Sequence, residues 1–179
     1  MDINEFAEEL KANREYFYQF PSPVISYWHW TASRYKTVFD EYHYCIQDDG
    51  LIVPTLPLDN VPQATWKRNS GSIAVSLCCC YDATPLNLGD YPPTDAQIEM
   101  SAQMMAKIAD VFDIPLDKDH FMTHGEVADI DGYGIHDSDP DCRWDLHILH
   151  TGDEWGSGGE ILREKALWYQ NEWRIEVGE

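Results

Sequence analysis

The stretch SIAVSLCCCY, residues 72–81, is a nearly continuous run of apolar and small side chains. A strand with one wet face alternates apolar and polar residues, so this run predicts a central strand buried on both faces. Residues 24–30 and 120–123 also have the composition of strands. Residues 42–47 and 51–53 predict a hairpin that turns at Asp49–Gly50.

Helices are predicted both before and after the central strand in the sequence. Thr94 is a good N-cap, and Gln97 stands at the capping-box position of a helix that should run to about Phe112. Two more helices are predicted over residues 2–17 and 159–169. Without repeats or a linker-like segment, residues 1–179 are expected to form a single α/β domain with a central mixed β-sheet flanked by helices.

Charge and composition exclude several classes of function. The chain has 12 basic and 32 acidic residues, a formal net charge of −20, and a surface this negative repels nucleic acid and anionic wall polymers. Its apolar runs are too short for membrane insertion. The N-terminal stretch MDINEFAEEL has no signal-peptide pattern, which predicts cytoplasmic synthesis. The chain has five cysteines, an odd number, and the consecutive Cys78, Cys79 and Cys80 are expected to be small core residues in a reducing compartment.

Two histidines stand where predicted strands give way to loops. His29 lies in YWHWTA, and His124 ends FMTH. Strand ends on one rim of a sheet are where α/β proteins build sites. A catalytic zinc site needs about three protein ligands, and the segment FMTHGEVADIDGYGIHDSDPDCRWDL, residues 121–146, offers several acidic candidates for the third. Its aspartates lack EF-hand spacing, so we favour a solvated acidic loop over a calcium site.

Five segments, in order, resemble the zinc-dependent N-acetylmuramoyl-L-alanine amidases of the type 2 superfamily, which includes phage lysozyme-type amidases and peptidoglycan recognition proteins. They are YWHWTAS at 27–33, EYHYCIQDDGLIV at 41–53, RNSGSIAVSL at 68–77, PPTDAQIEMSAQMMAKIADVFDIP at 92–115, and THGEVAD…DPDCRWDL within 123–146. The resemblance covers about residues 26–149. The N-terminal and C-terminal helices are then extensions of an amidase-like core.

The resemblance implies a set of zinc ligands. His29 and His124 match the two histidine ligands of the family, and Asp145 matches a third ligand that is cysteine or aspartate across the family. Cys142 is a rival for the third position. The family places this ligand two residues after a basic residue, here Arg143, which favours Asp145.

The resemblance also implies catalytic residues. Tyr42 matches a tyrosine beside the zinc-bound water, and Arg143 matches the basic residue that stabilises the oxyanion. Arginine does not deprotonate in proteins, so proton transfer falls to Tyr42, Glu126 or water.

The sequence departs from the family at two places. The central strand lacks the glutamate that some members carry, which puts more weight on Tyr42. Ala64 or Thr65 stands where many members have a histidine. Four tryptophans, Trp28, Trp30, Trp66 and Trp144, are candidates for stacking on sugars, although packing is the commoner role of a tryptophan.

These features predict a hydrolase that binds Zn²⁺ and cleaves the amide bond between N-acetylmuramic acid and L-alanine in peptidoglycan. A phage or prophage endolysin released by a holin fits a chain without a signal peptide. The alternatives are a peptidoglycan-binding module that has lost catalysis and a cytoplasmic amidase for soluble muropeptides.

Overall fold

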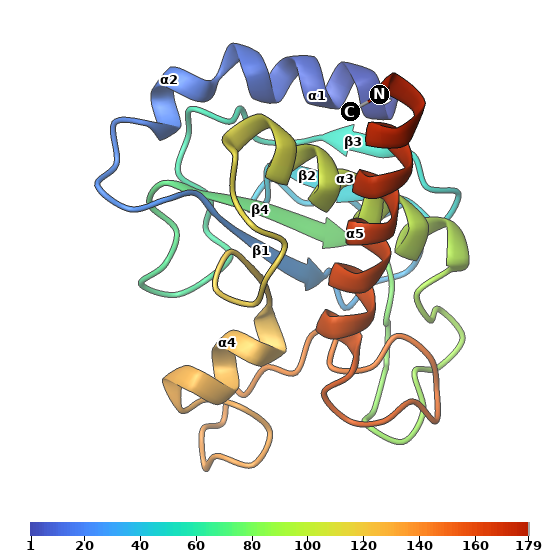
Figure 1. The fold of residues 1–179 in the computed structure, drawn as a ribbon. Coiled ribbons are helices and arrows are strands. Elements are labelled where there is room, and N and C mark those ends of the chain that lie inside the picture. The colour runs from blue at the N-terminus through green and yellow to red at the C-terminus, as the bar shows by residue number, and fades with distance from the viewer. Residues whose placement is uncertain (179) are drawn as a thin grey trace.

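The computed structural model describes residues 1–178 and places a five-stranded sheet at the centre of the protein (Figure 1). The strands are β1 (Ile25–Trp30), β2 (Tyr44–Ile46), β3 (Ile52–Pro54), β4 (Ser72–Leu77) and β5 (Phe121–Thr123). Their order in the sheet is β3-β2-β4-β1-β5. Only β3 runs antiparallel to its neighbour, so the sheet is mixed, as predicted.

The central strand is β4, and all six of its residues are buried. It lies between β1 and β2 and is parallel to both. The predicted strand extended to Tyr81, but β4 ends at Leu77, and the chain adopts a left-handed conformation at Cys80, where φ is 67°. Cysteines 78, 79 and 80 are buried free thiols, as the sequence predicted.

The helices are α1 (Ile3–Ala12), α2 (Arg14–Phe17), α3 (Asp95–Phe112), α4 (His124–Asp131) and α5 (Gly158–Val177). The predicted capping box starts α3: Thr94 Oγ1 accepts from the Gln97 amide at 3.1 Å, and Gln97 Oε1 accepts from the Thr94 amide at 3.0 Å. Gln97 Nε2 also donates to the carbonyl oxygens of Ile46 and Cys78. One buried side chain therefore caps α3 and ties it to the sheet.

The structure corrects three sequence predictions of helices. The predicted helix over 2–17 breaks at Asn13, whose side-chain Nδ2 donates back to the Glu9 carbonyl at 2.9 Å. Helix α5 continues to Val177, beyond the predicted end at 169. The segment after His124 was expected to be a loop, but it forms α4, because Thr123 and Glu126 make a second capping box.

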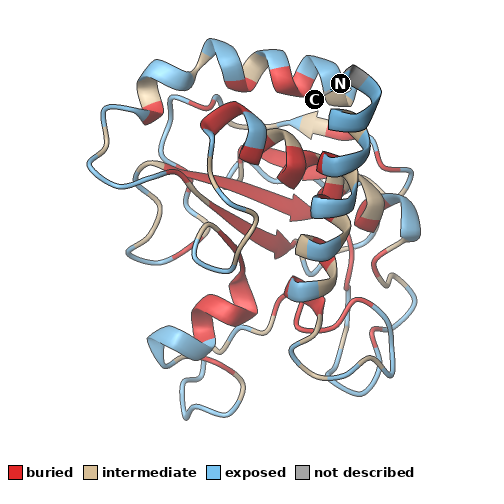
Figure 2. Ribbon diagram, viewed as in Figure 1, coloured by how far each residue is buried: buried red, intermediate tan, exposed pale blue. Residues whose placement is uncertain are grey.

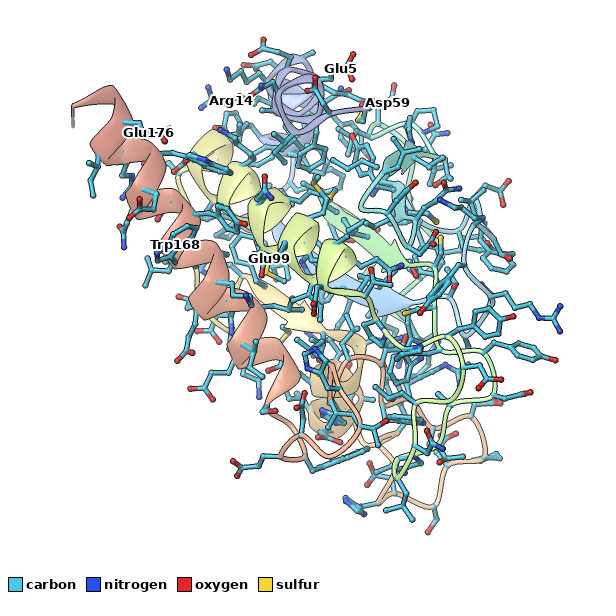
Figure 3. The ribbon with its side chains drawn as sticks, turned by 90° about the vertical axis from the view of Figure 1, so that its right-hand side faces the viewer. Glu5, Arg14, Asp59, Glu99, Trp168 and Glu176 are labelled. Carbon is cyan, nitrogen blue, oxygen red and sulfur yellow. The ribbon has the colours of Figure 1, made fainter. Side chains whose placement is uncertain are left out.

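Helices α1, α3 and α5 contribute to the main core, whereas α4 packs in a separate cluster with β1 and β5. Helix α3 packs against α5 and α1, and Figure 3 shows α5 lying outside α3. Figure 2 shows buried strands beneath helices whose outer faces are exposed. Along β1, Trp28 and Trp30 join the main core, whereas Tyr27 packs with Met122 and Val127 in a separate cluster. His29 alternates with the tryptophans and therefore faces the side opposite the main core.

A membrane-spanning helix is not found within residues 1–178, since none of the helices combines the necessary length and apolar composition.

Candidate metal centre

Two neighbouring parallel strands bring the histidines together. His29 is the penultimate residue of β1, and His124 is the first residue of α4, immediately after β5. In the register of these strands Trp28 pairs with Thr123, so the next residues along each chain, His29 and His124, stand at the same edge of the sheet. The structure therefore agrees with the expected placement of both histidines at one rim.

Asp145 reaches the histidines from the loop that precedes α5. Its Oδ2 accepts from the Trp30 amide at 3.4 Å, and its carbonyl oxygen accepts from the Gly125 amide at 3.1 Å. A side chain at Gly125 would meet this carbonyl, because a Cβ there would stand 3.0 Å from Asp145 O and from the His147 ring. The absence of a side chain at residue 125 lets the loop approach α4 closely enough to place the carboxylate.

The three side chains converge on one point. The Nδ1 atoms of His29 and His124 are 3.1 Å apart. Asp145 Oδ2 lies 3.4 Å from His124 Nδ1 and 3.8 Å from His29 Nδ1. Ligands bound to tetrahedral zinc at about 2.0–2.1 Å stand roughly 3.3 Å from one another. The observed separations fit that geometry, and all three residues are buried.

Electrostatics favour a cation at this point. Burial lowers the pKa of His29 to about 4, so the imidazole is neutral at pH 7. Burial alone would raise the pKa of the Asp145 carboxyl, but the facing histidines outweigh it and hold that pKa below its ordinary value. A neutral imidazole and a carboxylate both present lone pairs, and buried lone pairs that face each other require a cation or a proton between them.

Thr65 orients His29 and was not identified as a site residue from the sequence. Its buried hydroxyl Oγ1 lies 3.2 Å from His29 Nε2. If Nε2–H donates to this oxygen, the lone pair of Nδ1 is left for a metal. Asn69 holds Thr65 in turn, since its Oδ1 accepts from the amides of Ala64 and Thr65 at 3.2 and 2.7 Å.

Tyr42 and Arg143 line a cavity of about 500 Å³ beside the three convergent side chains. The ring centroids of Tyr42 and His29 are 5.1 Å apart. Burial, with the nearby Asp145 charge, raises the pKa of Tyr42 well above its usual range, so the phenol is protonated at neutral pH. Arg143 is exposed, and its Nη1 donates to the carbonyl oxygens of Asp141 and Cys142.

Two sequence candidates lie apart from the convergent group. Cys142 lines the cavity but does not join His29 and His124 in the cluster of metal-binding side chains found within residues 1–178. Glu126 turns toward α5, where both carboxylate oxygens accept from Arg163 at 2.9 Å. Its Oε2 also accepts from the Thr123 amide. These contacts give Glu126 a structural role, and its part in proton transfer stays a prediction from the sequence.

The aspartates of the acidic segment have separate local partners. Asp129 lies 3.0 Å from His147, and Asp131 pairs with Arg68. Asp137 accepts from the Gly134 amide, and Asp139 accepts from the Asp141 amide. Within the part of the chain that the structure describes, these carboxylates do not form a metal-binding group with one another.

A second cavity, of about 680 Å³, adjoins the first. The two cavities share Gln63, Ala64, His124 and Arg143 in their linings. We call the two together the groove. The first cavity, on the Tyr42 side, also includes Phe39 and Glu41, whereas the second includes Trp66, Asn69 and Tyr133. The groove therefore passes over the convergent residues and extends beyond them on both sides.

The chain resembles known proteins both in its sequence profile and in its structure. The profile of the N-acetylmuramoyl-L-alanine amidase family matches residues 17–142, which include His29, Tyr42 and His124 but end before Arg143 and Asp145. No curated protein sequence matches the chain.

Two solved structures illustrate the structural likeness. The endolysin amidase LysCS from Clostridium intestinale URNW shares 17% identity over 60% of this chain and 71% of its own, with a TM-score of 0.44. The Ph2119 endolysin of a Thermus scotoductus MAT2119 bacteriophage shares 15% identity over 86% of this chain and 95% of its own, with a TM-score of 0.49.

Proposed function

The chain belongs to the N-acetylmuramoyl-L-alanine amidase family, and on that premise we propose a zinc-dependent enzyme that cleaves the amide bond between N-acetylmuramic acid and L-alanine in peptidoglycan. The observation that carries the zinc proposal is the convergence of two histidine nitrogens and one carboxylate oxygen in a buried cluster. Two imidazoles and a carboxylate form a donor set typical of catalytic zinc.

His29, His124 and Asp145 would hold the metal. Zinc bound there would polarise the scissile carbonyl and lower the pKa of a bound water toward about 7. The complete ligand set favours catalysis over the alternative of a binding module that has lost its activity. Thr65 would keep His29 in the tautomer that presents Nδ1 to the metal.

Arg143 would stabilise negative charge that develops on the carbonyl oxygen. Its guanidinium carries five N–H donors, and Nη1 already donates to two backbone carbonyls that fix the side chain at the groove. A fixed cation beside a developing oxyanion lowers the energy of the transition state more than that of the ground state. Arg143 keeps its own proton throughout, so it acts by charge alone.

Tyr42 is the residue that we propose to orient water and pass a proton. Its phenol stays protonated at neutral pH and lines the groove, so it is able to donate a hydrogen bond to a bound water or substrate. In the overall hydrolysis, water oxygen bonds to the lactyl carbonyl carbon, the carbon–nitrogen bond breaks, and a proton passes to the alanine nitrogen. Burial beside Asp145 makes the Tyr42 phenolate unfavourable, so Tyr42 would act as a hydrogen-bond donor or relay.

The groove supports a polymeric substrate. Because it extends past the convergent residues on both sides, it suits a glycan strand with attached peptides, as an endolysin would meet in the wall. Recycling of soluble muropeptides is the alternative setting. Rates on intact sacculi and on soluble fragments separate the two, because an endolysin should release amino groups readily from sacculi.

The chemistry is tested by purified protein loaded with zinc and given peptidoglycan. The expected product is a new L-alanine amino terminus, detected by end-group labelling. Arg143→Ala should lower kcat by about 10²–10³ while zinc content stays at one ion per chain, the loss expected when one oxyanion donor is removed. Tyr42→Phe should also lower kcat with zinc retained. Full activity of Arg143→Ala would remove its proposed role, and absence of the product from the unmodified protein would refute the function.

A further inference from the structure

Trp66 is an exposed tryptophan in the wall of the groove. Its side chain is 65% exposed, and it lines the second cavity together with Asn69 and Tyr133. The other candidates for sugar stacking are accounted for by packing. Trp28 is fully buried. Trp30 and Trp144 line the first cavity, but their rings pack edge to face at 4.5 Å and Trp30 is only 6% exposed. Trp66 is therefore the most exposed of the four candidates, and its indole is available to a ligand.

The loop around Trp66 is held firmly while the indole points to solvent. Thr65, the residue before it, is buried against His29, and Asn69 binds the loop backbone. Arg68 pairs through two hydrogen bonds with Asp131, at 2.6 and 2.7 Å, which joins the loop to α4. Lys67 has a left-handed backbone, with φ of 60°, a conformation that costs energy in a residue other than glycine. An ordered loop with local strain keeps Trp66 exposed beside the convergent residues.

The second cavity has the composition of a saccharide site. The C–H face of a sugar ring is apolar and packs on an indole, whereas its hydroxyl and acetamido groups need hydrogen-bond partners at the ring edge. Gln63 and Asn69 offer amide groups around Trp66, and Asp139 and Asp141 offer carboxylates. Lys67 Nζ lies 4.0 Å from the Trp66 ring centroid, and this cation–π contact helps to hold the ring in position.

We propose that Trp66 is the platform on which a sugar ring of the glycan strand stacks, and that the second cavity holds the glycan. This inference rests on the proposed function, since it assigns the parts of that substrate to the two sides of the groove. The scissile amide joins the sugar's lactyl group to the peptide. With the amide at the convergent residues, a glycan on the Trp66 side leaves the Tyr42 side to the peptide stem.

The test separates binding from catalysis. Peptide-free N-acetylated glycan fragments are titrated into the zinc-loaded protein by calorimetry, with the unmodified chain, Trp66→Ala and Trp66→Phe compared. Trp168→Ala is the matched control, because Trp168 is 57% exposed on α5 and points away from the body of the protein (Figure 3). Trp66→Ala should weaken glycan binding roughly three- to tenfold, the size expected for loss of one aromatic stacking contact. Trp66→Phe should restore part of the loss, and Trp168→Ala should have no effect.

Hydrolysis of two small substrates completes the experiment. One is a disaccharide muropeptide, and the other is a lactoyl peptide that keeps the scissile amide and the stem but lacks the sugar. Trp66→Ala should raise KM for the muropeptide and leave KM for the lactoyl peptide unchanged. An equal rise in KM for both substrates would place the peptide stem, not the glycan, at Trp66 and overturn the inference. Unchanged glycan binding in Trp66→Ala would overturn it too, even with amidase activity intact. Conversely, Trp66-dependent glycan binding without hydrolysis by the unmodified chain would refute the proposed function alone.

Discussion

At the scale of single residues, the structure bears most directly on whether Asp145 or Cys142 is the third metal ligand. Asp145 and Cys142 lie three residues apart in one loop, yet the carboxylate of Asp145 stands 3.4 Å from His124 Nδ1 while Cys142 lies outside the convergent group. Asp145→Ala should therefore abolish stoichiometric zinc binding, and Cys142→Ala should retain one zinc per chain. Elemental analysis after dialysis against limiting chelator measures both. Zinc loss in Cys142→Ala with retention in Asp145→Ala would reverse the assignment.

Thr65 provides a second prediction at this scale. Thr65→Val keeps the shape of the side chain but removes the hydroxyl that faces His29 Nε2 at 3.2 Å. Loss of a partner that orients a metal ligand typically lowers metal affinity 10–100-fold. We expect Thr65→Val to lower zinc affinity by this factor, measured by competition with a chromogenic zinc chelator. Thr65→Ser should restore most of the affinity. Equal zinc affinity in Thr65→Val and the unmodified chain would show that His29 needs no such partner.

The sequence pointed to some of these residues and not to others. His29 and His124 stand at strand ends, and the family resemblance singled out Asp145 two residues after Arg143. Thr65 lies 36 residues from His29, and their contact depends on the path of the loop that Asn69 holds. The family resemblance had placed Ala64 or Thr65 where many members have a histidine, but no local pattern encodes the path that brings Thr65 to His29.

At the scale of elements, α4 shows a signal that was present in the sequence but not used. Thr123 and Glu126 form the same capping box as Thr94 and Gln97, which correctly predicted the start of α3. The carboxylates that follow suggested a loop, because charged residues are common in solvated segments. Helix α4 places His124 at its first position, where the backbone that carries the ligand is fixed by the cap.

The pair Glu126–Arg163 joins α4 to α5 and gives a prediction of stability. Their side chains are only 6% and 12% exposed, and both carboxylate oxygens accept from the guanidinium at 2.9 Å. Removing one partner of a buried pair leaves the other charge unsatisfied, at a cost of about 3–5 kcal/mol. Arg163→Ala should lower the free energy of unfolding, measured with urea, by about 3 kcal/mol. Lys11→Ala breaks an exposed pair with Glu8 and should cost less than about 1 kcal/mol.

The same pair separates structural from catalytic roles of Glu126. Glu126→Gln keeps the side-chain volume and one hydrogen-bonding oxygen, so the variant should fold with reduced stability. Its kcat per zinc-loaded molecule should match that of the unmodified chain, since the carboxylate faces α5. A large fall in kcat in folded, zinc-loaded Glu126→Gln would instead make Glu126 the proton-transfer group that the sequence left as a possibility.

At the scale of the whole molecule, the buried run at residues 72–81 led to the correct architecture. Its six-residue core became β4, with a parallel neighbour on each side. The helix ends were harder to predict, because they depend on single side chains and tertiary packing. Asn13 ends α1 by bonding back to Glu9, and α5 is prolonged where Trp173 lies under Lys107, whose Nζ is 3.8 Å from the ring centroid.

Net charge governs the encounter of the whole molecule with its substrate. The chain carries 12 basic and 32 acidic residues, for a formal charge of −20. Lys67 and Arg68 are adjacent basic residues and form a local exception to this charge. In the structure Arg68 is paired with Asp131, which neutralises one of these two basic residues. Long-range repulsion from anionic wall polymers should therefore oppose binding.

Activity on intact anionic walls should consequently rise with moderate salt. Exposed charges are screened over about 8 Å at physiological ionic strength, so added salt shortens the range of the repulsion between protein and wall. The rate of amino-group release from intact walls, measured from low to physiological salt, should increase. Walls stripped of their anionic polymers and a small neutral muropeptide serve as controls, and their rates should change little. A fall in rate with salt on intact walls alone would show that Lys67 and its surroundings attract the wall despite the net charge, and Lys67→Glu should then abolish that salt dependence.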